Sequence, residues 1–398
     1  MKYCINVLQL IAVFFGFSVP VLGQYSSPAS YKVLTLDSLV ALSSGVVVQN
    51  NGIYQINQDI TINYLDTLLI KEPATILVAT GKKVLINGVI ISAPQNGRVV
   101  FSAIDTSATS SYFKGFKISN SSASVFKNTT IMHGGGIHVL DSDMLFDSCL
   151  IRNNGFSNVN AAITYVNCSP TIRNCIFKDN KRAAIGSGSN VSGSPQILNN
   201  IFIHNTADNS NRPQLNLGQG GEDTIRIVGN YIEGYWPRSG GIIVTTYFGG
   251  SAKVLLKDNE IRNNRYGYSQ TGGNISSLII NNLIVTNNLE TNIMQGGAGL
   301  DFSATTASGN ASVVRGNTIY DNLWGVTIQG VANADLGTEE SPGHNLIYNN
   351  GNGGELFNVY MTSVNNVNAI NNYWGCESEL EIENMVYHGI DEPGFGMV

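Results

Sequence analysis

The chain has 398 residues, a formal net charge of −6 and a pI near 5.4. The sequence has 22 basic and 28 acidic residues and no basic stripe, which argues against nucleic acid or an anionic membrane as partner. Only 13% of the residues are charged and 43 are glycine, a composition that favours short strands and tight turns over long helices.

The N-terminus, MKYCINVLQLIAVFFGFSVPVLGQ, has a basic start, an apolar stretch and small residues near Gly23. This pattern is typical of a secretory signal that is cut after Gly23. A transmembrane anchor is the alternative, but the apolar run 7–22 is shorter than the roughly 20 residues that a span needs. The sequence therefore predicts a signal peptide at residues 1–23 and an exported protein, either secreted or held at the cell surface.

The predicted mature chain is a single elongated domain with a cap at each end. Residues 24–45 are predicted as the N-terminal cap, in which YKVLTLDSLVALSSG forms a short helix or strand over the open end of a stack. Residues 46–375 are the repetitive body. Leu380, Ile382 and Met385 indicate a small amphipathic C-terminal cap at 376–398. The abrupt end at Val398 leaves open that the chain is a fragment of a larger surface protein.

A short phrase recurs along the body: an apolar residue, Asn three positions on, an apolar residue two later, and Asn three after that. Ile197-Asn200-Phe202-Asn205 is one example. The first Asn, or a Cys in its place, stands at positions 149, 175, 200, 230, 259, 282, 317, 345 and 372. A period of about 23 to 35 residues indicates a solenoid, and the short Val, Ile, Phe and Thr runs indicate strands. The sequence predicts a parallel β-helix whose coils stack about 4.8 Å apart.

Each coil also carries a strand that starts with small residues, such as GGGIHV, AAITYV or GGIIVT. Two alternating sets of its positions are mostly apolar. The first is Ile137, Ile163, Ile185, Leu215, Ile242, Tyr268, Leu300 and Val326, and the second is Val139, Tyr165, Ser187, Leu217, Val244, Gln270, Phe302 and Ile328. The set between them, here called the outward column, is mostly polar: His138, Thr164, Gly186, Asn216, Ile243, Ser269, Asp301 and Thr327. Because side chains alternate along a strand, the apolar sets are predicted to point inward and the outward column toward solvent.

The recurring asparagines are interpreted as structural. Asn tolerates left-handed backbone, and identical amides in register can form ladders from coil to coil. In two coils the first Asn is replaced by Cys149 and Cys175. Stacked neighbours lie within the range that a disulfide allows, and a reduced stack is the equally open alternative. The cysteines show no paired spacing typical of zinc, so no metal site is predicted.

With these features the chain resembles the right-handed parallel β-helix proteins of the pectate-lyase-like superfamily, in particular their bacterial secreted and surface members. The phrases GGGIHV...FDSCLIRNN, NCSPTIRNCIFKDN and NNYWG carry the likeness, which extends over roughly residues 45–398. The resemblance implies an all-β fold: a single-stranded, right-handed parallel β-helix of about a dozen coils with terminal caps. It implies no single activity, since the superfamily includes lyases, hydrolases and adhesins.

Evidence for catalysis in the sequence is thin. Lyases on this fold need clustered carboxylates for Ca²⁺ and a basic residue near the sugar, and hydrolases need two or three aspartates. The outward column contains one carboxylate, Asp301, between Ser269 and Thr327. A catalytic site would have to be assembled from loops, and the weak candidates are Arg238, Arg265 and Asp301.

Evidence for binding is better. Arg182, Tyr266 and Trp324 stand directly before the small-residue strand in three coils. Tyr235, Trp236 and Arg238 occur together in GYWPRSGG. Exposed aromatic side chains on a long face can stack on sugar rings, with Arg and Asn as hydrogen-bond partners. The alternative is that these aromatic residues pack against coil edges and loops.

The sequence therefore predicts an exported β-helix that binds polysaccharide, or serves as an adhesive or structural element, without catalysis. We expect a monomer whose partner is a polysaccharide or cell-surface glycan, with no cofactor. The alternative is a polysaccharide lyase or related carbohydrate-active enzyme acting in the groove of the β-helix, and only this alternative calls for Ca²⁺.

Overall fold

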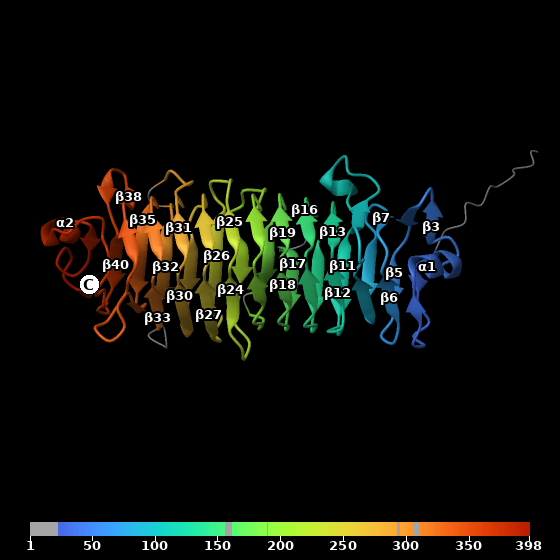
Figure 1. Ribbon diagram of the computed structural model, residues 1–398, viewed down its shortest axis with the longest axis horizontal. Helices are drawn as coiled ribbons and strands as arrows, with labels where there is room; N and C mark the ends of the chain where they lie inside the picture. Colours follow the sequence, from blue (N-terminus) through green and yellow to red (C-terminus); the bar gives the residue numbers. More distant parts are fainter. Residues whose placement is uncertain (1–22, 156–160, 189, 293–294, 306–310) are drawn as a thin grey trace, which may run out of the picture.

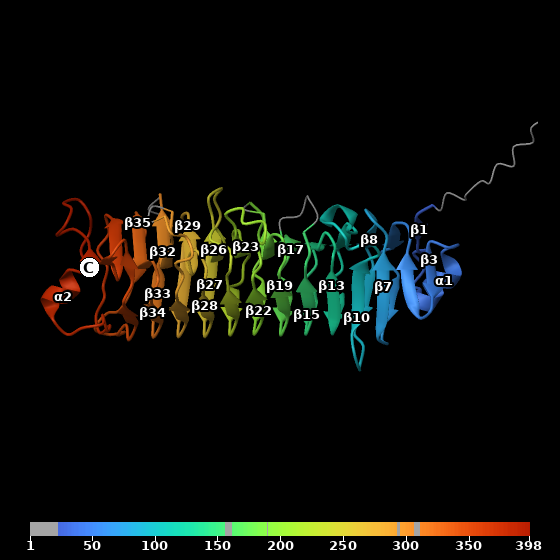
Figure 2. The same ribbon diagram turned by 90° about the horizontal axis from the view of Figure 1, so that it is seen from above.

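The structure is a computed structural model, and it describes residues 23–155, 161–188, 190–292, 295–305 and 311–398. The predicted signal peptide lies outside the described residues, apart from Gly23. The chain winds into one long solenoid with its N-terminal part at one end and its C-terminal part at the other (Figure 1). Three sheets run along its whole length, which the view from above also shows (Figure 2). The all-β solenoid predicted from the repeat is confirmed.

The three sheets take one strand each from most coils, so that about twelve coils are stacked. Within the described residues, sheet A contains β1 (Tyr25–Ser26), β5 (Ile60–Ile62), β8 (Lys83–Ile86), β11 (Gly115–Ser119), β14 (Ile137–Leu140), β17 (Ala161–Val166), β20 (Ala183–Ser187), β23 (Pro213–Leu217), β26 (Gly240–Thr245), β29 (Tyr268–Thr271), β32 (Ala298–Ala304), β35 (Trp324–Gly330), β40 (Val359–Ser363) and β41 (Val386–Tyr387). Sheet B contains β2 (Val33–Leu34), β6 (Thr67–Ile70), β9 (Val89–Ser92), β12 (Val125–Lys127), β15 (Leu145–Asp147), β18 (Thr171–Arg173), β21 (Gln196–Leu198), β24 (Ile225–Val228), β27 (Ala252–Lys257), β30 (Ile275–Ile280), β33 (Ser312–Arg315) and β36 (Ala334–Asp335). Sheet C contains β3 (Val47–Asn50), β4 (Ile53–Ile56), β7 (Ala74–Val78), β10 (Val99–Ala103), β13 (Thr129–Met132), β16 (Leu150–Arg152), β19 (Ile176–Lys178), β22 (Ile201–Ile203), β25 (Tyr231–Glu233), β28 (Glu260–Arg262), β31 (Leu283–Val285), β34 (Thr318–Tyr320) and β37 (Leu346–Tyr348).

The register of sheet A is the one read from the sequence. Ile137 pairs with Ile163 and Ile163 with Ile185, and the pairing continues in step to Val326. Inward side chains of these strands are almost completely buried, and the outward column is partly accessible at several positions. Because every coil uses the same alternation, the apolar core continues without interruption along the axis.

The recurring asparagines form two ladders inside the solenoid, which confirms their structural role. In the first ladder, the amide of Asn200 donates to Oδ1 of Asn230, that of Asn230 to Asn259, and so on to Asn372. In the second, each amide likewise donates to the next Asn at positions 154, 180 and 205, and again at 264, 287, 322, 350 and 358. Each ladder asparagine except the terminal Asn372 is buried, so these bonds satisfy amides that water cannot reach.

One detail of the prediction was wrong. At every ladder position except Asn358, the left-handed backbone belongs to the residue before the asparagine and not to the ladder asparagine itself. Examples are Asn199 before Asn200, with φ 54°, and Asp321 before Asn322, with φ 55°. The preceding residue, which is exposed or half-buried, makes the sharp turn, and the following amide then points into the core. His344 occupies such a turn position before Asn345, with φ 49°.

The second ladder is interrupted in one coil and repaired from another strand. Tyr235 stands where the repeat would have its second Asn, and its side chain is 60% exposed. Gln214 of β23, which is completely buried, fills the gap. Its Oε1 accepts from Asn205 at 2.9 Å, and its Nε2 donates to Oδ1 of Asn264 at 3.1 Å. The amide ladder therefore continues through a residue outside the repeated phrase.

The cysteine stack is reduced in this structure. Cys149 and Cys175 are both free and buried. The backbone N–H of Cys149 donates to Sγ of Cys175 at 3.3 Å, as that of Cys175 donates to Oδ1 of Asn200 at 2.9 Å. A thiol thus replaces an amide in the first ladder, and burial raises the pKa of Cys175 well above its ordinary value.

Short elements close the two ends. Helix α1 (Leu36–Leu42) buries Leu36 and Leu39 against the first coil, next to the antiparallel pair β3 and β4. At the other end lie the pair β38 (Gly351–Asn352) and β39 (Glu355–Leu356) and helix α2 (Glu379–Glu383), while a 3-10 turn, η1 (Thr109–Ser111), lies in an early loop. Strands β1, β2 and β41 join the sheets from within the segments predicted as caps. Among the described residues, no helix is long and apolar enough to span a membrane.

Candidate functional site

The outward column of sheet A forms the floor of a groove near the C-terminal half of the solenoid. Asn216, Ile243, Ser269, Asp301 and Thr327 follow one another in register from β23 to β35. The groove has a volume of about 560 Å³. The residues lining it are Asn211, Arg212, Pro213, Asn216, Ile243, Arg265, Tyr266, Ser269, Gly296, Gly297, Ala298, Asp301, Trp324, Thr327, Gln329 and Tyr360.

Asp301 in the floor is held by its stacked neighbours. Ser269 donates to Oδ2 at 2.7 Å, and Thr327 donates to Oδ1 at 2.7 Å. Gln329, two residues along β35, donates to Oδ1 at 3.0 Å. Burial raises the pKa of this carboxyl, and the three hydrogen bonds oppose that rise. Asp301 is therefore a fixed acceptor whose oxygens are already engaged.

Tyr266 fills one wall because its neighbours are glycines. A Cβ on Gly240 would lie 2.2 Å from the Tyr266 ring, and one on Gly297 would lie 2.2 Å from the Tyr266 Cβ. The small residues at the strand starts thus allow an aromatic side chain to lie between two coils. Burial raises the pKa of Tyr266, with the Arg265 charge opposing the rise, so the phenol stays neutral.

Arg265 joins two loops at the edge of the groove. Its Nε donates to the Gln295 carbonyl at 2.6 Å, and Nη1 donates to Oδ1 of Asn211. Arg212 lines the groove next to Asn211. The loop side of the groove therefore carries positive charge, across from a floor that carries the single carboxylate of Asp301.

Aromatic side chains continue from the groove toward the C-terminal end. The Trp324 ring lies 4.6 Å from that of Tyr360 and 5.2 Å from that of Phe357. Tyr360 stacks in turn on Tyr387 at 4.7 Å. These side chains form an aromatic strip in the continuation of the outward column, since Thr327, Tyr360 and Tyr387 pair in register.

The structure brings together four of the residues singled out from the sequence: Arg265, Tyr266, Asp301 and Trp324 all line the groove. The other four are not among its lining residues. Arg182 lies 3.9 Å from Asp208 in an ion pair. The Tyr235 ring contacts His204 and Trp236, with centroids 5.1 and 5.0 Å apart. Arg238 has an exposed side chain, and its backbone N–H donates to Asn209.

Sequence reasoning missed Tyr360, Arg212 and Asn211. Tyr360 belongs to β40, where the repeat is imperfect, so the outward column was followed only to Thr327. A search for the Val-Tyr-Met alternation at 359–361 could have extended it. The loop 207–212 carries no repeat signal, and its approach to Arg265 follows only from the folded chain.

The charged side chains that line the groove are Asp301, Arg212 and Arg265. Among its lining residues, Asp301 is the one carboxylate, whereas glycosidases use two that face each other. In the described part of the chain, no group of three or more His, Cys, Asp and Glu side chains is placed to hold a metal ion. His133 and His138, on an earlier coil, have pKa values lowered by burial and lie outside the groove.

A known family matches about half of the chain. The family described as "Right handed beta helix region" matches residues 38–232. This chain is a right-handed β-helix protein. The match is consistent with the resemblance to the pectate-lyase-like superfamily, and the groove itself lies mostly beyond the matched residues of the β-helix. No curated protein and no solved structure matches the chain.

Proposed function

We propose that this β-helix protein is exported and binds polysaccharide in the groove on sheet A without cleaving it. The observation that carries the proposal is the combination of Tyr266, Trp324 and Tyr360 in one groove with the polar floor residues Asn216 and Asp301. Aromatic faces stack on the apolar faces of sugar rings. A side-chain amide both donates hydrogen bonds to hydroxyl groups and accepts them, and a carboxylate accepts them.

The spacing of the coils supports an extended chain as ligand. Successive floor residues are one strand spacing apart, about 4.8 Å. A polysaccharide lying along the solenoid axis would meet an equivalent position in each coil. Arg212 and Arg265 at the loop side favour a glycan that carries carboxylate or sulfate groups.

The test is binding of the mature chain to immobilised acidic and neutral polysaccharides, with and without Ca²⁺. We expect Trp324→Ala to weaken binding about tenfold, the effect of losing about 1.4 kcal/mol of contact energy. Trp236→Ala is the matched control, because Trp236 is an aromatic residue outside the groove, and it should bind as the unaltered chain does. Equal binding by both variants, or binding to no glycan, would contradict the proposal.

The same panel tests catalysis. A carbohydrate-active enzyme remains the second candidate because Arg265 and Asp301 share the groove. It predicts unsaturated products, followed by ultraviolet absorbance, or new reducing ends, and loss of turnover in Asp301→Asn. Turnover of any glycan would replace the binding proposal by this one.

A further inference from the structure

The charges of the chain are strongly segregated along its length. Residues 316–398 contain eleven Asp and Glu residues and neither Lys nor Arg. The rest of the chain therefore holds all 22 basic residues and 17 acidic ones. Sequence order follows the solenoid axis (Figure 1). The end formed by residues 316–398 is therefore acidic, and the remainder of the chain is weakly basic. A separation of this size produces a field that attracts cations to the acidic end.

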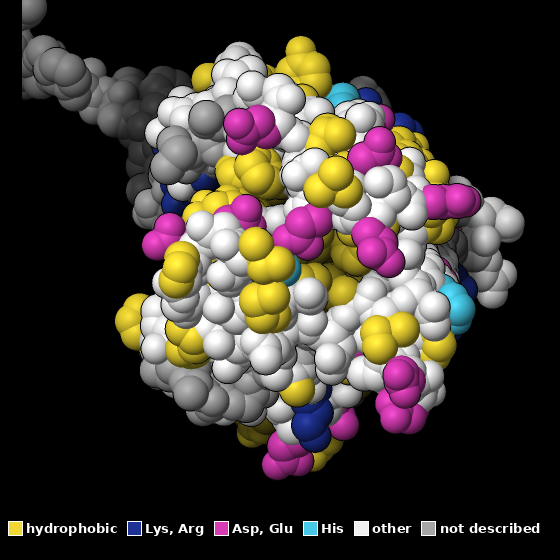
Figure 3. Space-filling view, turned by 90° about the vertical axis from the view of Figure 1, so that its left-hand side faces the viewer, with side chains coloured by type: hydrophobic (Ala, Val, Ile, Leu, Met, Phe, Trp, Pro, Cys, Tyr) yellow, Lys and Arg dark blue, Asp and Glu magenta, His cyan; other side chains and the backbone are white. Residues whose placement is uncertain are grey.

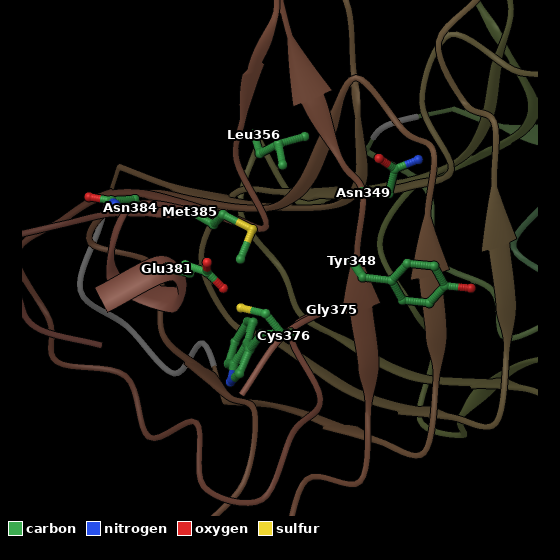
Figure 4. Close-up of a pocket in the computed structure, with 9 residues that line it drawn as sticks. Tyr348, Asn349, Leu356, Gly375, Cys376, Glu381, Asn384 and Met385 are labelled. Atoms are coloured by element: carbon green, nitrogen blue, oxygen red, sulfur yellow. The ribbon is translucent and has the colours of Figure 1, made fainter. Parts of the chain in front are cut away.

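A pocket lies at this acidic end, separate from the groove on sheet A. Its volume is about 520 Å³, and it is lined by Tyr348, Asn349, Leu356, Trp374, Gly375, Cys376, Glu381, Asn384 and Met385. In Figure 4 the carboxylate of Glu381 points toward Met385 and Cys376, and Leu356 lies on the opposite side. The Tyr348 ring points away and stacks on Tyr320 at 5.1 Å. An apolar pocket is thus edged by a carboxylate that points into it.

The surface around the pocket adds further negative charge. The end-on view shows Asp and Glu side chains distributed around a hollow with hydrophobic side chains in it (Figure 3). Glu377, Glu379 and Glu381 are exposed on or directly before helix α2. Glu383 is half-buried and bonded to His388 at 2.9 Å, so it is already paired.

We propose that this pocket binds a basic segment of a partner protein, with an Arg or Lys side chain inserted beside Glu381. Charge complementarity identifies the occupant: residues 316–398 contain no Lys or Arg. Asp335 pairs with Arg315 and Glu383 with His388, whereas Glu381 at the pocket is in none of the ion pairs between described residues. The stem of Arg or Lys is apolar enough for Leu356, Trp374 and Met385, and its charged head pairs with a carboxylate. Trp374 is the aromatic lining residue near Glu381, and its ring adds a favourable cation–π contact. This surface is independent of the groove on sheet A.

Cys376 provides the measurement. It is partly accessible and lines the pocket, whereas the other free cysteines of the described residues, Cys149, Cys168 and Cys175, are buried. A thiol reagent added to the folded mature chain should therefore modify Cys376 alone. We expect an arginine-rich peptide to slow this modification severalfold at low ionic strength and less at high salt. A peptide with Glu in place of Arg should have no effect. Fluorescence anisotropy of the labelled peptide gives its Kd independently.

Two double variants separate the pocket from the overall charge. Glu377→Gln with Glu381→Gln removes one charge that lines the pocket and one that is next in sequence to the lining residue Cys376, and it should weaken peptide binding about tenfold. Glu222→Gln with Asp223→Asn removes two exposed charges from a loop in the middle of the solenoid and should leave binding unchanged. Equal weakening by both pairs would overturn the proposal, as would equal protection by an uncharged peptide or by Ca²⁺ alone. Glycan binding in the groove should be the same in all variants.

Discussion

At the scale of single residues, the side chain of Gln214 joins two parts of a buried ladder. It accepts from Asn205 and donates to Asn264 and to the carbonyl of Glu233. Gln214→Ala leaves these buried groups without partners, at a cost of about 2–4 kcal/mol. We expect a lower denaturant midpoint by circular dichroism. Gln49→Ala, at an exposed position of β3, is the control and should change little. An unchanged midpoint for Gln214→Ala would mean that the ladder does not need this link.

The carboxyl of Asp301 makes stability depend on pH. Its pKa in the folded chain is raised by burial, so the folded state holds the proton more tightly than the unfolded state does. Stability should therefore fall as pH rises from about 3.9, the ordinary Asp value, through the raised value, and then remain level. The Asp301→Asn variant has no carboxyl at this position, so its stability should not show this fall with pH. The difference in unfolding free energy between Asp301→Asn and the unaltered chain should grow across that interval, by about 1.4 kcal/mol for each unit by which the pKa is raised. A pH-independent difference would show that the three hydrogen bonds fully offset burial.

At the scale of elements, helix α1 protects the first coil. Leu39 of α1 is completely buried, whereas Leu42 of the same helix is 57% exposed. Leu39→Ala should lower stability by about 2–4 kcal/mol and loosen the helix, and Leu42→Ala should have little effect. An uncovered sheet edge can pair with another chain, so Leu39→Ala should also associate as its concentration rises. Light scattering of the two variants side by side is the measurement, and equal monomer content would argue that α1 is dispensable as a cover.

Strands and loops differ in how far the sequence determines them. The three-sheet solenoid and the sheet A register follow from alternation and from the Asn phrase, because these signals repeat in every coil. Asp301 could be placed in the outward column for the same reason, whereas Trp324 could be located only as the residue before the strand. Tyr235, Trp236 and Arg238 belong to an irregular loop, and the repeat carries no information about where such a loop lies. Gln214 illustrates the same limit: its sequence position gives no sign that it completes a ladder of asparagines.

At the scale of the whole molecule, the solenoid couples each coil mainly to its neighbours. Strands pair with the preceding and following coil, and both ladders run along the axis. A local defect should therefore spread over adjacent coils and fade with distance, as in other repeat proteins. The separation of charge also runs along the axis, because the position of a residue in the sequence sets its position along the solenoid.

Asn282 in the middle of the first ladder tests this coupling. Its amide donates to Asn317 at 2.8 Å, and its Oδ1 accepts from Asn259 at 2.9 Å. Asn282→Ala removes both bonds and leaves buried groups unpaired, at about 1–3 kcal/mol each. Hydrogen exchange followed by mass spectrometry should show faster exchange in β27, β28, β30, β31, β33 and β34, and unchanged exchange in β7, β8 and β10. Asn288→Ala, at an exposed position close by in sequence, is the control. Uniformly faster exchange along the whole chain would indicate instead that the β-helix unfolds as one cooperative unit.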